Sequence, residues 1–100
     1  MNTKINYLYR DADNYKVHNE CVVQGTISAE QIAVILECLD EGEYFIPHLV
    51  GLPEKRFDTF DPQVDHPYFE LSEDSFAETM ESETVEVQVD ELVSAFLCCK

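Results

Sequence analysis

Lysine and arginine are scarce in this 100-residue chain, and neither occurs between residues 57 and 99. The sequence has six lysines and arginines against 21 aspartates and glutamates, which gives a formal net charge of −15 at pH 7. Proteins that neutralise phosphates use clusters of basic side chains, and only Lys55 and Arg56 are adjacent here. This composition argues against direct binding to nucleic acid. It also disfavours an anionic membrane surface as a partner.

Long apolar runs are also missing. No stretch approaches the roughly 18 apolar residues that a membrane span requires. Residues 1–7, MNTKINY, lack the continuous apolar segment of a signal peptide. We therefore expect a cytoplasmic protein, in which the four cysteines are reduced thiols.

The motifs that would indicate a metal site or an enzyme are absent from the sequence. With only three glycines, the chain has no glycine-rich phosphate loop, and it has no G-x-S-x-G nucleophile motif. The three histidines and four cysteines do not form the paired motifs of zinc sites, and no two cysteines form a C-x-x-C pair. We therefore predict a protein that is not an enzyme and that uses no metal or cofactor.

The sequence does contain patterned apolar residues, which argue for a folded domain despite the high charge. Alternation over residues 5–10, turn formers at 11–14 and strand character over 15–27 predict an antiparallel hairpin. Further strands are predicted at 68–71 and at 84–89, where valines alternate with polar residues. Three other segments have weaker patterns: a short strand with a packed connector at 43–53, an ordered loop at 57–64, and an acidic connection at 72–82 that could hold a helical turn around Phe76 and Met80.

Two helices are predicted from helical spacing of apolar residues. Ser28 and Gln31 have the spacing of a capping box, so the first helix covers about 29–41, with Gly42 as its C-terminal stop. Asp90 is the expected cap of a closing helix over about 90–98. We therefore predict an α+β fold for a single acidic globular domain, 1–100, with an antiparallel sheet of about four to five strands packed with two helices.

The acidity is concentrated in the second half of the chain. Twelve carboxylates lie between residues 57 and 99, often three to five residues apart and within predicted elements. A rigid acidic surface can imitate the phosphate rows of nucleic acid and attract a basic partner. The bland alternative is a solvated face that only keeps the protein soluble. The residues that we assign to a partner-binding face are Glu70, Glu73, Asp74, Glu78, Glu81, Glu83 and Glu86.

The tyrosines have two interpretations. They are either residues at the edge of the core with their hydroxyls in water, or anchors of an interaction face, where tyrosine is over-represented. Both interpretations apply to Tyr7, Tyr9, Tyr15, Tyr44 and Tyr68.

Residues 5–16, INYLYRDADNYK, resemble the start of a group of small, acidic, uncharacterised bacterial proteins. Residues 42–45, the turn at 51–53 and the Asp65-His66 pair are similar to theirs as well. This resemblance covers about the first seventy residues and implies a bacterial or phage origin, with no activity attached. In size and charge the chain is also similar to anti-CRISPR and other phage anti-defence proteins, many of which are small, acidic and non-enzymatic.

These observations lead to one functional prediction and one alternative. We predict a non-enzymatic acidic binding protein, in its sharpest form an anti-CRISPR or nucleic-acid-mimic inhibitor. Its partner would be a basic protein such as a CRISPR effector or another nucleic-acid-binding complex, whose basic groove it blocks in a bacterial cell or phage-infected host. The alternative is a housekeeping or regulatory bacterial protein of unknown partner, whose acidity serves solubility.

Overall fold

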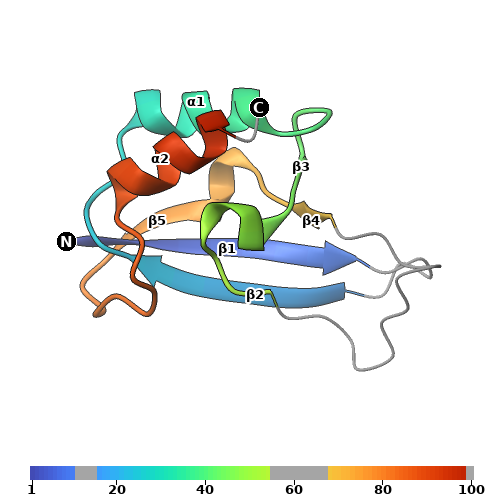
Figure 1. Ribbon diagram of the computed structural model, residues 1–100. Helices are drawn as coiled ribbons and strands as arrows, with labels where there is room; N and C mark the ends of the chain where they lie inside the picture. Colours follow the sequence, from blue (N-terminus) through green and yellow to red (C-terminus); the bar gives the residue numbers. More distant parts are fainter. Residues whose placement is uncertain (11–15, 55–67, 99–100) are drawn as a thin grey trace.

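The computed structural model describes residues 1–10, 16–54 and 68–98, in which a five-stranded antiparallel sheet carries two α-helices on one face (Figure 1). The α+β prediction is therefore confirmed. The predicted turn at 11–14 and the predicted loop at 57–64 lie outside the described residues.

The hairpin predicted at the start of the chain is present. Strands β1 (Asn2–Arg10) and β2 (Lys16–Val23) pair over all of β2 and over β1 from Thr3 to Arg10, with Ile5 opposite Cys21. Alternate residues of β1 are buried beneath the helices, as the period of two requires.

The other edge of β1 is shared by two short strands. Strand β5 (Phe76–Thr79) pairs with the first half of β1, and β4 (Phe69–Glu70) pairs with its end. Strand β3 (Tyr44–Phe45) pairs in turn with β4. A short 3₁₀ turn, η2 (Glu73–Ser75), connects β4 to β5.

The helical turn suggested around Phe76 and Met80 is therefore wrong. Phe76 begins β5 opposite Ile5, so the segment pairs with the backbone of β1 and packs the Phe76 side chain against the core. Backbone pairing along an otherwise open strand edge outweighs a weak local preference for a turn.

Helix α1 (Ala29–Cys38) has the predicted capping box. The Gln31 amide donates to Ser28 Oγ at 3.1 Å, and the Ser28 amide donates to Gln31 Oε1 at 2.9 Å. The stop predicted at Gly42 is wrong, because the helix ends at Cys38 and Leu39 is already extended. Asp40 then pairs with Tyr44, so Gly42 lies in the tight turn that enters β3.

Helix α2 (Val89–Cys98) confirms the closing helix, but its cap differs from the prediction. The Gln88 amide donates to Glu91 Oε1 at 3.2 Å, one residue before the helix begins. Asp90 is not the cap: its Oδ1 accepts from Gln31 Nε2 at 3.0 Å and so connects the two helices.

The strand predicted over 84–89 is not formed. This segment crosses past the end of β2, makes one isolated bridge between Gln24 and Gln88, and enters α2 at Val89. Val85 and Val87 pack against the core as expected. The alternation of valines therefore predicted their burial correctly but predicted a paired strand incorrectly. The predicted connector after β3 is confirmed as the 3₁₀ turn η1 (Pro47–Val50).

The core lies between the sheet and the helices. Aromatic rings fill its centre, with Tyr9 and Phe69 5.0 Å apart and Tyr7 and Phe45 5.7 Å apart, measured between ring centroids. Ile35 of α1 and the buried residues of α2 cover them. The opposite face of the sheet carries mostly polar side chains, and this outer face positions part of the acidic surface.

Candidate interaction surface

The seven predicted carboxylates do not share one face of the molecule. Glu70 lies opposite Leu8 on the outer face of the sheet. Glu78 lies opposite Thr3, whose side chain is buried toward the helices. Because paired residues share a face, Glu78 is on the helix side of the sheet, at its edge, and not on the outer face with Glu70. The remaining residues lie in η2 and in the connection that follows β5, and they are Glu73, Asp74, Glu81, Glu83 and Glu86.

Glu70 is partly neutralised by an ion pair. Its Oε2 lies 2.9 Å from Arg10 Nε, and its side chain is only 19% exposed. Hydrogen bonding to Glu70 raises the pKa of Arg10, and the negative charge of the carboxylate adds to the effect.

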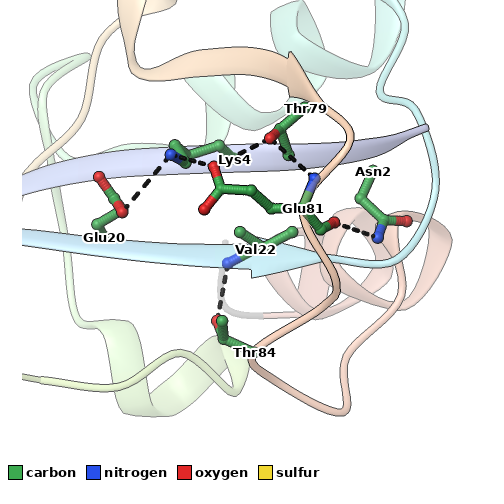
Figure 2. A network of polar contacts seen from close by, with 7 residues as sticks. All are labelled: Asn2, Lys4, Glu20, Val22, Thr79, Glu81 and Thr84. Carbon is green, nitrogen blue, oxygen red and sulfur yellow. Dashed lines mark hydrogen bonds and ion pairs between the residues drawn. The ribbon is translucent and has the colours of Figure 1, made fainter.

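Glu81 is in an ion pair with Lys4 (Figure 2). Lys4 Nζ also lies 3.7 Å from Glu20 Oε1, and Thr79 Oγ1 donates to Glu81 Oε2 at 3.0 Å. The hydrogen bond from Lys4 is the main cause of the lowered pKa of Glu81, and the same bond raises the pKa of Lys4. The charges of Glu81 and Glu70 are therefore partly neutralised by ion pairs within the protein.

Glu73 and Asp74 are exposed and held by a well-defined backbone. The Ser75 amide donates to Ser72 O at 3.0 Å, and the Ser72 amide donates to Ser75 Oγ at 3.0 Å. These reciprocal bonds fix the single turn of η2. The backbone that carries these two adjacent, exposed carboxylates is thus held in one conformation.

Sequence reasoning missed three carboxylates from the first half of the chain, which are Asp40, Glu41 and Glu43. The pairing of β3 with β4 brings them beside the second half, and the Leu71 amide donates to Glu43 O at 2.9 Å. Because most of the acidity lies in the second half of the sequence, these three carboxylates were not assigned to the surface. Only knowledge of the strand pairing could have revealed their position.

Two tyrosines lie next to these missed carboxylates. The rings of Tyr44 and Tyr68 are 6.4 Å apart between centroids and inclined at 60°. Together with Asp40 and Glu41 they line a hollow in the surface. The pKa of the Tyr44 phenol is raised, first by the negative charge of Glu43.

The described residues hold no group of three or more histidines, cysteines and carboxylates that is suited to a metal ion. The Cys21 thiol is buried in the core, and burial raises its pKa to about 11, which leaves it protonated at neutral pH. Within the described ranges, no helix is long and apolar enough to cross a membrane.

Comparisons with protein families, curated proteins and solved structures find no match to this chain. What the protein does is therefore inferred from its own surface.

Proposed function

We propose that this protein is a non-enzymatic binding protein whose acidic surface occupies the basic groove of a nucleic-acid-binding bacterial complex. In the most specific form of the proposal it is an anti-CRISPR inhibitor, and the partner is a CRISPR effector. The complex would form through carboxylates that replace the phosphates of the natural nucleic acid.

The observation that supports this proposal is the fixed placement of exposed carboxylates. Glu73 and Asp74 lie on the hydrogen-bonded turn η2, and Glu78 lies on β5, which is paired with β1. A ligand that already holds its charges in place loses less conformational entropy on binding than a flexible acidic tail does.

The charge balance gives a second support. Lys4 and Arg10 are ion-paired within the protein, while the exposed acids of η2 and β5 add to a net charge of −15. Such a field accelerates encounter with a cationic groove and is screened by salt.

The test is a pull-down from a nuclease-treated bacterial lysate at about 50 mM and about 500 mM NaCl, which changes the Debye length from about 14 to about 4 Å. We expect a basic nucleic-acid-binding protein to be retained at low salt and largely lost at high salt. Adding the partner's own nucleic acid should displace it. If no such protein is retained at low salt, the proposal is wrong.

A further inference from the structure

The hollow beside β3 and β4 combines two aromatic rings with carboxylates. Tyr44 lies opposite Glu70 in the strand register, and Tyr68 is two residues before Glu70. Residues paired across two strands point to the same side, so Tyr44 lies with Glu70 on the outer face of the sheet, and the Tyr68 ring lies 6.4 Å from the Tyr44 ring between centroids. Tyr68 is 37% exposed, and Tyr44 is half-buried.

Backbone hydrogen bonds position the carboxylates against these rings. The Asp40 amide donates to Tyr44 O and the Tyr44 amide donates to Asp40 O, both at 2.9 Å. Glu41 follows with a φ of 55°, an uncommon conformation for a residue other than glycine. The hollow is therefore built on a closed backbone turn.

The electrostatic environment of the hollow is negative. Glu43 and Glu70 stand close enough to Tyr44 to oppose ionisation of its phenol, and Arg10, which lowers that pKa, is engaged by Glu70. An anionic ligand in this hollow would be repelled by these carboxylates. A cation would be attracted by the carboxylates and by the faces of both rings.

Arginine fits this combination better than lysine does. Its planar guanidinium stacks on aromatic rings and pairs with carboxylates through several donors, whereas the lysine ammonium is a compact and strongly hydrated charge. We propose that the tyrosine–carboxylate site, formed by Asp40, Glu41, Tyr44 and Tyr68, binds an arginine side chain of the basic partner. This assignment rests on the proposed function and adds an anchoring point to it.

The probe is a short peptide with arginines separated by glycine and serine, titrated at low salt against the isotope-labelled full-length chain and followed by NMR. A peptide with citrulline in place of arginine removes the charge and keeps nearly the same shape. A peptide with lysine in place of arginine tests the preference for guanidinium. We expect the arginine peptide to shift the Tyr44 and Tyr68 ring signals, the lysine peptide to bind more weakly, and the citrulline peptide to leave them unchanged.

Tyrosine variants that keep the net charge, and two pairs of variants that lower it equally, separate the site from general attraction. Tyr44→Leu and Tyr68→Leu should each weaken binding of the arginine peptide about three- to five-fold, while Tyr44→Phe and Tyr68→Phe, which keep the rings, should bind nearly as the native protein does. Asp40→Asn with Glu41→Gln should weaken binding more than Glu30→Gln with Glu37→Gln, which removes the same charge from α1. Circular dichroism checks that each variant is folded.

Three results would overturn the site. If leucine and phenylalanine variants bind alike, or if both charge-neutralised pairs lose the same affinity, the arginine peptide binds by general attraction and the proposed function is unaffected. If the arginine peptide does not bind at all, the site does not exist, and the lysate pull-down still decides the proposed function independently.

Discussion

At Gly51 the side chain of Val87 leaves no space for a Cβ atom. Gly51 has a φ of 84°, and a Cβ placed there would lie 2.6 Å from Val87 Cγ2. Gly42 has a similar φ of 73° but no atom within 4 Å of the corresponding position. Gly42→Ala should therefore cost only the left-handed backbone penalty of about 1–2 kcal/mol, and Gly51→Ala should cost clearly more.

Urea unfolding of the two alanine variants measures this difference. Adding Val87→Ala to Gly51→Ala should recover part of the loss, because it removes the clashing methyl groups. Equal losses at the two glycines would show that the contact between Gly51 and Val87 is not tight in solution.

Burial of the Cys21 thiol has a consequence for reactivity. Because the exposed Cys98 is accessible and the buried Cys21 is held protonated, an alkylating reagent at about pH 8 should label Cys98 first and Cys21 only after unfolding in urea. Peptide mass mapping distinguishes the two sites. Rapid labelling of Cys21 in the folded protein would contradict the packing of the hairpin.

The Cys21 thiol makes the free energy of unfolding depend on pH in the alkaline range. The pKa of Cys21 is raised from 9.0 in the unfolded reference to about 11 in the fold, so above pH 9 the unfolded thiol ionises while the folded one does not. The free energy of unfolding should therefore fall between pH 9 and 11. Cys21→Ala should reduce this pH-dependent fall, as urea titrations at each pH would show.

The ion pair between Lys4 and Glu81 gives the opposite dependence on the acid side. The folded pKa of Glu81 is below its reference of 4.5, so its contribution to stability is complete above pH 4.5 and is lost as the pH falls through the folded pKa. Glu81→Gln should be less stable than the native protein at pH 6, and the two stabilities should converge as the pH falls through the folded pKa of Glu81. A constant difference across that range would mean that the charge of Glu81 contributes nothing.

At the scale of elements, Thr84 covers the end of the edge strand β2. The Val22 amide donates to Thr84 Oγ1 at 2.9 Å (Figure 2). The Thr84 amide donates in turn to Val22 O at 2.9 Å. Thr84→Val keeps the shape but leaves the Val22 amide without this acceptor, so it should cost about 1–2 kcal/mol. Thr84→Ser keeps the hydroxyl and should cost less, as urea unfolding of the two variants would show. Equal stability of valine and threonine there would contradict this assignment.

The elements that were predicted correctly are those whose sequence pattern matches their local geometry. The hairpin follows from alternation around Ile5, and α1 follows from the Ser28 capping box. The strand prediction for 84–89 was wrong because alternating valines indicate alternating burial, which a crossing connection also produces. The helical turn predicted around Phe76 was wrong because the strand that forms there exists only through pairing with β1, a partner about seventy residues away in sequence.

The candidate surface was predicted less completely than the fold for the same physical reason. The sequence identifies which residues are acidic, but the strand register decides that Glu70 meets Arg10. The crossing of the chain after β5 decides that Glu81 meets Lys4. The pairing of β3 with β4 adds Asp40 and Glu41 to the surface. Each of these contacts joins segments far apart in the chain, where local patterns carry no information.

At the scale of the whole molecule, a net charge of −15 opposes the compact state. Raising NaCl from about 20 to about 300 mM shortens the Debye length several-fold and weakens this repulsion more than it weakens the few exposed ion pairs. We expect the melting temperature, measured by calorimetry, to rise over this range. A fall would mean that attractive pairs outweigh the repulsion among carboxylates.

In the proposed function, the carboxylates of η2 and β5, and not acidity in general, recognise a basic partner. The most direct measurement is the affinity of the purified pull-down partner for two charge-matched variants at low salt. Glu73→Gln with Glu78→Gln changes η2 and β5, whereas Glu30→Gln with Glu37→Gln removes the same charge from α1. We predict that the first variant binds at least several-fold more weakly than the second, with a shallower dependence on salt. Equal affinities for the two variants would contradict the claim.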